Sequence, residues 1–177
     1  MTGTNEGQVS GNHPVRPFFK GLVRRGLAQV NLDDEPAVCY VANLMADFMS
    51  TDQLYPIRDP AGNRLEYLSD LVVEAHKVVE PGLRLDRFRY LGDLTLFMLG
   101  LFPERFQRGR HAMAREFYRI QGRSSYSTVA GLVAAPSEPV FRSLAEHYDQ
   151  YVGGLHQVSL YTRDPFYQYM FRQFGVS

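Results

Sequence analysis

The segment FRSLAEHYDQYVGGLHQV, residues 141–158, carries the most regular hydrophobic pattern in the chain. Its apolar and aromatic residues recur at alternating spacings of three and four, which is the period of one face of an α-helix. The pattern passes without interruption through Gly153 and Gly154. We therefore expect one helix over this segment, with the glycine pair marking a close contact or a bend inside it. The repeating positions are Phe141, Leu144, Tyr148, Tyr151, Leu155 and Val158.

The same helical period recurs along the rest of the chain, and no stretch alternates between apolar and polar residues as a half-buried strand would. Outside residues 141–158, we expect six helices. In the first half of the chain, one follows Pro17 and ends near Val30, one extends from Asp33 or Asp34 to Met49, and one extends from Asn63 to Val79. In the second half, the expected helices are Phe88–Phe102, about Arg110 to Ala134, and Phe166–Phe174. The sequence therefore predicts an all-α single domain of about six to seven helices, with irregular or bundle-like packing.

Proline, glycine and capping residues mark the predicted boundaries. The longest predicted loop is STDQLYPIRDPAGN at residues 50–63, and EPGL at residues 80–83 is expected to end the helix that follows it. Ser137 and Asp164 are expected to cap the last two helices, and Gly175 to close the final one.

Length and composition fit one ordinary domain, because 177 residues with 45% hydrophobic content can bury a core. Residues 1–15 are expected to form a flexible polar N-terminal tail, and residues 16–177 the helical domain. The tail lacks the pattern of a secretory signal, and the longest apolar runs are far shorter than the ~20 residues that span a bilayer. These features predict a cytoplasmic protein with no membrane partner.

No local motif predicts catalysis or metal binding. The five histidines are scattered singly, and Cys39 is the only cysteine, so neither a His-Glu-x-x-His helix nor a multi-thiolate site is present. GRSSY at residues 122–126 is not a nucleophile elbow, because Tyr126 occupies the position of the second glycine. We expect no catalytic residue, no metal and no cofactor, and whether the protein is an enzyme stays open, with the balance toward no.

Arginines are concentrated in the second half of the chain. Residues 84–123 contain nine arginines and four acidic residues, although the whole chain has a net charge of zero. A row four residues apart, consisting of His111, Arg115, Arg119 and Arg123, predicts a stripe on one helix face that could bind an anion. The alternatives are a solvated face and pairing with acids on neighbouring helices, such as Asp70, Glu74 or Glu146.

Asp93 follows Gly92 inside an apolar helix, where a carboxylate is costly unless it has a partner. Arg89 lies one turn earlier, and the next helix offers Ser125 and other polar residues. We expect either a polar network that sets the register of two helices or a small ligand site formed by Asp93, Arg123, Ser124 and Tyr126. Gly122, Ser125 and Val129 form a narrow face that predicts a close contact between the two helices.

The C-terminal segment is dense in aromatic residues, which cover nearly the whole circumference of a short helix. One face must reach the core, so the remainder is expected to form a surface for a partner or to line a groove of the same domain. These residues are Phe166, Tyr167, Tyr169, Met170, Phe171 and Phe174.

Three functional hypotheses follow. The first is a non-enzymatic helical protein that binds another protein or itself, as a regulatory, accessory or assembly subunit, through the aromatic helix and the arginine-rich face. The second is a helical binder of a small anionic molecule, or an enzyme, with a pocket between the helices at 88–102 and 110–134. The third is a nucleic-acid-binding regulator, which is disfavoured because the net charge is zero and no helix-turn-helix spacing is clear.

Overall fold

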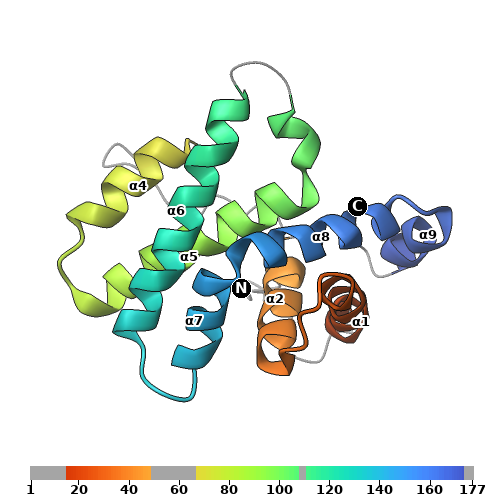
Figure 1. The fold of residues 1–177 in the computed structure, drawn as a ribbon, viewed down its shortest axis with the longest axis horizontal. Coiled ribbons are helices and arrows are strands. Elements are labelled where there is room, and N and C mark those ends of the chain that lie inside the picture. The colour runs from red at the N-terminus through yellow and green to blue at the C-terminus, as the bar shows by residue number, and fades with distance from the viewer. Residues whose placement is uncertain (1–14, 49–66, 108–110, 174–177) are drawn as a thin grey trace, which may run out of the picture.

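The structure is a computed structural model that describes residues 15–48, 67–107 and 111–173, without the side chains of residues 111, 112, 167, 170 and 171. Every regular element in these ranges is helical, and the helices pack together as Figure 1 shows. The elements are α1 Val15–Ala28, α2 Glu35–Phe48, α4 Leu68–Lys77, α5 Pro81–Leu101, the 3₁₀ turn η1 Pro103–Phe106, α6 His111–Leu132, α7 Glu138–Glu146, α8 Tyr148–Thr162 and α9 Pro165–Gln173. The all-α prediction is confirmed.

Several predicted boundaries hold. The Asp34 carboxylate accepts a hydrogen bond from the backbone N–H of Ala37 at 3.2 Å, and the Asp164 carboxylate accepts one from Phe166 at 2.8 Å. Ser137 stands at the cap position of α7, but its side chain makes no capping hydrogen bond. Helix α1 begins at Val15, which was expected to be the last residue of the tail. Residues 1–14, the predicted loop at 50–63 and Gly175 lie outside the described residues.

The prediction for EPGL at residues 80–83 was incomplete, because this segment also begins α5. The Glu80 carboxylate accepts hydrogen bonds from the backbone N–H groups of Gly82 and Leu83 at 2.9 and 2.5 Å, and Pro81 stands in the first turn. Glu80 therefore caps a helix that begins at Pro81, seven residues before the expected start at Phe88.

The prediction of one helix over residues 141–158 was wrong, since the chain turns at His147 between α7 and α8. The backbone of His147 has φ −107° and ψ 26°, outside the helical range. Helix α7 packs against α6 and α2, whereas α8 packs against α1 and α5 and runs in a different direction (Figure 1). A single straight helix could not place residues 141–146 against α6 and α2 and also place residues 148–158 against α1 and α5.

The interpretation of the glycine pair is confirmed, because α8 continues through Gly153 and Gly154. A Cβ atom on Gly154 would overlap the Leu27 side chain, and one on Gly26 would overlap the carbonyl oxygen of Gly154. Glycine on both helices thus allows α1 and α8 to approach backbone to backbone.

Helix α5 lies at the centre of the domain, and α4, α6 and α8 all contact it. Its closest neighbour is α6, whose Gly122, Ser125 and Val129 are buried, as the sequence predicted. A Cβ atom on Gly122 would overlap the hydroxyls of Tyr148 and Thr95, and one on Gly92 would lie 2.7 Å from the Tyr126 ring. Tyr126 therefore fits over Gly92, which brings its hydroxyl to Asp93.

Candidate functional site

Asp93 joins three helices through one carboxyl oxygen. The hydroxyl of Tyr126 on α6 donates a hydrogen bond to Asp93 Oδ1 at 2.8 Å, and the hydroxyl of Tyr40 on α2 donates to the same atom at 2.7 Å. Tyr126 is one of the residues that the sequence predicted beside Asp93. Two donors on one oxygen fix the orientation of the whole carboxyl group.

Burial raises the pKa of Asp93 to about 7, because neighbouring protein atoms displace the water that would stabilise the carboxylate. The hydrogen bonds from Tyr40 and Tyr126 and the positive charge of Arg89 lower this pKa, and the Asp47 carboxylate raises it. Burial also raises the pKa of both tyrosines well above the usual value. The tyrosines therefore remain hydrogen-bond donors at neutral pH, while Asp93 exists in both protonation states.

A hollow of about 480 Å³ opens between α2 and α5 beside Asp93. Its walls combine aromatic, apolar and charged side chains, contributed by Tyr40, Asn43, Leu44, Asp47 and Phe48 of α2 and by Asp86, Arg87, Arg89, Tyr90 and Asp93 of α5. Asp93 is part of this wall, and its Oδ2 atom accepts no hydrogen bond from the described residues.

Two of the acidic side chains in the walls are ion-paired. Asp47 lies 2.7 Å from Arg16 of α1, and Asp86 lies 3.1 Å from Arg89. The expected partner of Asp93 one turn earlier, Arg89, thus pairs with Asp86 and acts on Asp93 only through its charge.

Arg123 and Ser124 do not lie beside Asp93. They line a second hollow of about 480 Å³, between α6 and α7, together with Arg119, Ile120, Ser127, Ala145 and Glu146. Arg123 Nε donates a hydrogen bond to the carbonyl oxygen of Ala145 at 3.2 Å. The four residues predicted as one polar site are therefore divided, with Asp93 and Tyr126 at the α2–α5–α6 junction and Arg123 and Ser124 at the hollow between α6 and α7.

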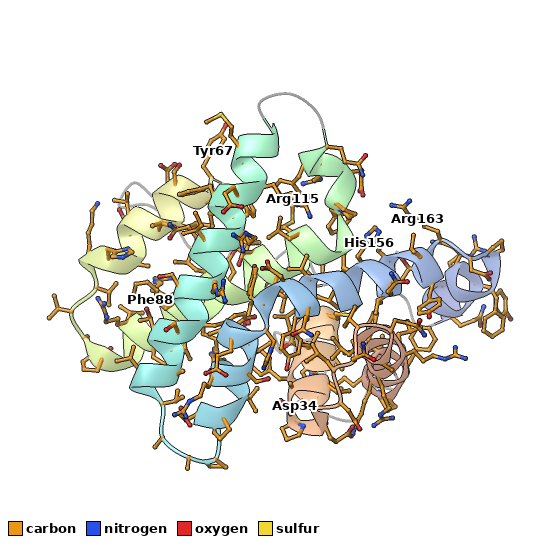
Figure 2. All side chains as sticks on the ribbon, viewed as in Figure 1. Asp34, Tyr67, Phe88, Arg115, His156 and Arg163 are labelled. Carbon is orange, nitrogen blue, oxygen red and sulfur yellow. The ribbon has the colours of Figure 1, made fainter. Side chains whose placement is uncertain are left out.

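The predicted arginine stripe is only partly available to a ligand. Arg119 forms ion pairs with Glu116 and with Asp149 of α8, both at 2.9 Å. Arg115, labelled in Figure 2, is exposed on α6, and neither it nor Arg123 forms an ion pair with a described residue. The side chain of His111 is outside the described residues. Pairing with acids thus accounts for one arginine, although the acids differ from those expected.

An apolar stripe on α6 did not emerge from the sequence analysis. Met113, Phe117 and Ile120 are 82%, 38% and 51% exposed, and they follow one another at spacings of four and three. They lie on the face of α6 opposite Gly122 and Val129, so they cannot reach the core. The sequence does contain a signal for this stripe, because α6 carries a second row of apolar residues at helical spacing in addition to the row that packs in the core.

The aromatic C-terminal helix is described in part. Phe166 and Tyr169 are 62% and 53% exposed, and α9 lies at the end of the molecule beside α8 (Figure 1). Phe174 and the side chains of Tyr167, Met170 and Phe171 are outside the described residues. These two side chains are exposed, and the surface for a partner stays a prediction.

Tyr40 was missed because its signal is weak. It occurs within an apolar helix 53 residues before Asp93, and nothing local in the sequence relates the two.

Within the described residues, no group of three or more His, Cys, Asp or Glu side chains could hold a metal ion. None of these described helices has both the length and the apolar character required to cross a membrane. Comparisons with protein-family models, with curated proteins and with solved structures found no match.

Proposed function

We propose that this protein acts by binding a partner protein, as a regulatory, accessory or assembly subunit without catalytic activity of its own. The observation that carries the proposal is the α6 apolar stripe, formed by Met113, Phe117 and Ile120. Large apolar side chains that face water in helical register usually mark a surface that another protein covers. Isolated exposed apolar residues are common, but a continuous row on one helix is not.

The stripe leads into the hollow between α6 and α7, because Ile120 belongs to both. Ala145 and Arg123 also form part of the wall. A groove of this kind suits an amphipathic helix, whose apolar side chains would pack on the stripe while one of them enters the hollow.

Charge indicates which amphipathic helix would fit. Arg123, which lines the hollow together with Ile120, has no ion-pair partner among the described residues. A guanidinium group at the edge of an interface favours a carboxylate on the partner. We therefore expect the partner helix to carry aspartate or glutamate along one edge of its apolar face.

The engagement of Arg119 supports a protein partner over a nucleic acid. Two carboxylates, from Glu116 and Asp149, already neutralise this central arginine of the row. Phosphate groups would meet these carboxylates and be repelled, whereas a protein helix can place its own charges around them.

Site-specific crosslinking in the source cells tests the proposal. A photoreactive benzoylphenylalanine replaces Ile120, and in a matched control it replaces Val73, which is 53% exposed on α4. We expect the probe at position 120 to capture a segment that mass spectrometry maps to an acidic amphipathic helix. With the purified partner, Ile120→Asp should weaken binding at least about tenfold, with less than about 0.5 kcal/mol change in the free energy of unfolding.

Two results would overturn the proposal. The first is an identical set of adducts from positions 120 and 73, because the surface would then have no selectivity. The second is capture only of nucleic acid, or of segments without carboxylates, since the arginine edge would have no matching partner.

A further inference from the structure

We propose that the hollow between α2 and α5 binds a small organic amine, whose protonated nitrogen lies against Asp93 Oδ2. This inference does not depend on the α6 apolar stripe, which lies on a different face of the domain. It rests on the geometry around one carboxyl group, on the charges that surround it and on the walls of the hollow.

The carboxyl group is held in place before any ligand binds. Tyr40 and Tyr126 both donate to Oδ1, so the position of Oδ2 is fixed as well. No described residue donates to Oδ2, and Asp93 lines the hollow. A fixed acceptor in the wall of a hollow is the arrangement by which binding sites orient a polar ligand.

The charges near Asp93 favour a cation over an anion. Asp47 on the opposite wall adds a second negative charge, although Arg16 pairs with it. Arg89 is held by Asp86. Arg87 also lines the hollow, but six residues of helix place it about 9 Å from Asp93 along the axis of α5. An anionic ligand at this position would be repelled by the ionised carboxylate of Asp93, with the Asp47 carboxylate in the opposite wall.

The walls indicate an organic cation. Tyr40, Phe48 and Tyr90 are aromatic and Leu44 is apolar, so they can contact a hydrocarbon body and, through their ring faces, an ammonium group. The volume of about 480 Å³ lies within the range of small-molecule sites. A metal ion would need several oxygen or nitrogen ligands, and the described residues offer no such group. The ligand class is thus a primary or secondary amine on a small aromatic or aliphatic body.

Binding should depend on pH because the ammonium group pairs with the ionised form of Asp93. With a pKa of about 7, the ionised fraction of Asp93 rises roughly tenfold between about pH 6 and about pH 8. Tyr40 and Tyr126 stay protonated over this range, since burial raises their pKa values. The amine itself remains protonated, so its affinity should rise by up to about tenfold across the same range.

Isothermal titration calorimetry on the full chain tests the proposal. The probes are phenethylamine, n-butylamine, the neutral isostere 2-phenylethanol and the anion phenylacetate. We expect phenethylamine or n-butylamine to bind at least about tenfold more tightly than 2-phenylethanol or phenylacetate. The amine should also bind more tightly at about pH 8 than at about pH 6. Asp93→Asn should weaken amine binding at least about tenfold, whereas Asp70→Asn, which changes an exposed aspartate on α4, should leave it unchanged.

The asparagine variant is suited to this test because its side-chain oxygen can still accept both tyrosine hydrogen bonds. A cooperative thermal unfolding transition confirms that the variant is folded. Equal affinity for the amine and the alcohol, tighter binding of phenylacetate, unchanged binding by Asp93→Asn, or no binding of either amine at concentrations up to roughly 10 mM would each overturn the proposal.

Discussion

At the scale of single residues, Asp93 shows how one polar group can be accommodated inside an apolar helix. Its Oδ1 atom accepts hydrogen bonds from Tyr40 and Tyr126, which lie on two other helices. The sequence could predict Tyr126 as one of several candidate partners on the next helix, but not that Tyr126 would be the one to reach Asp93. Tyr40 could not be predicted in this way, since its approach depends on how α2 packs against α5.

The raised pKa of Asp93 makes a prediction about stability. The usual pKa is 3.8 and the folded value is about 7, so between these values the folded protein retains a proton that the unfolded chain has lost. The contribution of Asp93 to stability therefore falls as the pH rises from about 4 to about 7 and is constant above that. We expect the difference in free energy of unfolding between wild type and Asp93→Asn to fall by about 1 to 4 kcal/mol over this range.

Urea unfolding of both proteins at several pH values measures this difference directly. Other titrating groups contribute equally to both proteins and cancel in the subtraction. A difference that stays constant from about pH 4 to about pH 8 would show that Asp93 has the same pKa in the folded and unfolded states.

The two tyrosine donors make a second prediction. Their hydrogen bonds stabilise the carboxylate and so lower the pKa of Asp93. Removing one donor by Tyr126→Phe should raise this pKa further, and a ¹³C NMR titration of the Asp93 carboxyl group would measure the change. Tyr148→Phe is the control, because the Tyr148 hydroxyl donates to Thr95 and not to Asp93. A pKa that rises equally in both variants, or in neither, would contradict the assigned roles.

At the scale of helices, hydrophobic period predicted most elements and their buried faces, but not where the seam at residues 141–158 divides. The spacing of apolar residues is continuous across His147 because α7 and α8 each bury one helix face. This spacing does not reveal that the two buried faces pack against different helices. The same limit applies to Arg123 and Ser124. Their register on α6 was clear from the sequence, but the position of α7, which sets what they contact, was not.

Helix packing supplies a prediction with an internal control. Gly122 and Gly131 both lie in α6, but a Cβ atom on Gly122 would overlap Tyr148 and Thr95, whereas one on Gly131 would meet nothing within 4 Å. We expect Gly122→Ala to lower the free energy of unfolding by about 2 kcal/mol or more. Gly131→Ala should be neutral or should stabilise by up to about 1 kcal/mol, because alanine favours a helix.

Chemical denaturation of the two variants decides the outcome. Equal effects would mean that α6 does not approach α5 and α8 closely at Gly122. Gly26→Ala and Gly21→Ala offer an independent pair on α1, since only the first would overlap the backbone of α8.

At the scale of the whole molecule, two of the surfaces that expose apolar side chains lie on different helices. One is the α6 apolar stripe, and the other lies at the C-terminal end, where Leu160 of α8 and Tyr169 of α9 are 45% and 53% exposed. The net charge of zero means that two copies of the chain do not repel each other at long range. We therefore expect the C-terminal surface to bind a second copy of this chain, and the stripe to remain available for a different partner.

Sedimentation velocity over a range of protein concentrations tests this division. The double variant Leu160→Ser/Tyr169→Ser should weaken self-association and change the free energy of unfolding by less than about 1 kcal/mol, because both side chains are already exposed to water. Met113→Ser/Ile120→Ser removes exposed apolar side chains from α6 instead and should leave self-association unchanged. If the α6 variant dissociates the protein and the C-terminal variant does not, the stripe is the self-association surface. A wild type that stays monomeric at every concentration would exclude the C-terminal contact, because its two exposed side chains would then have no second copy to cover them.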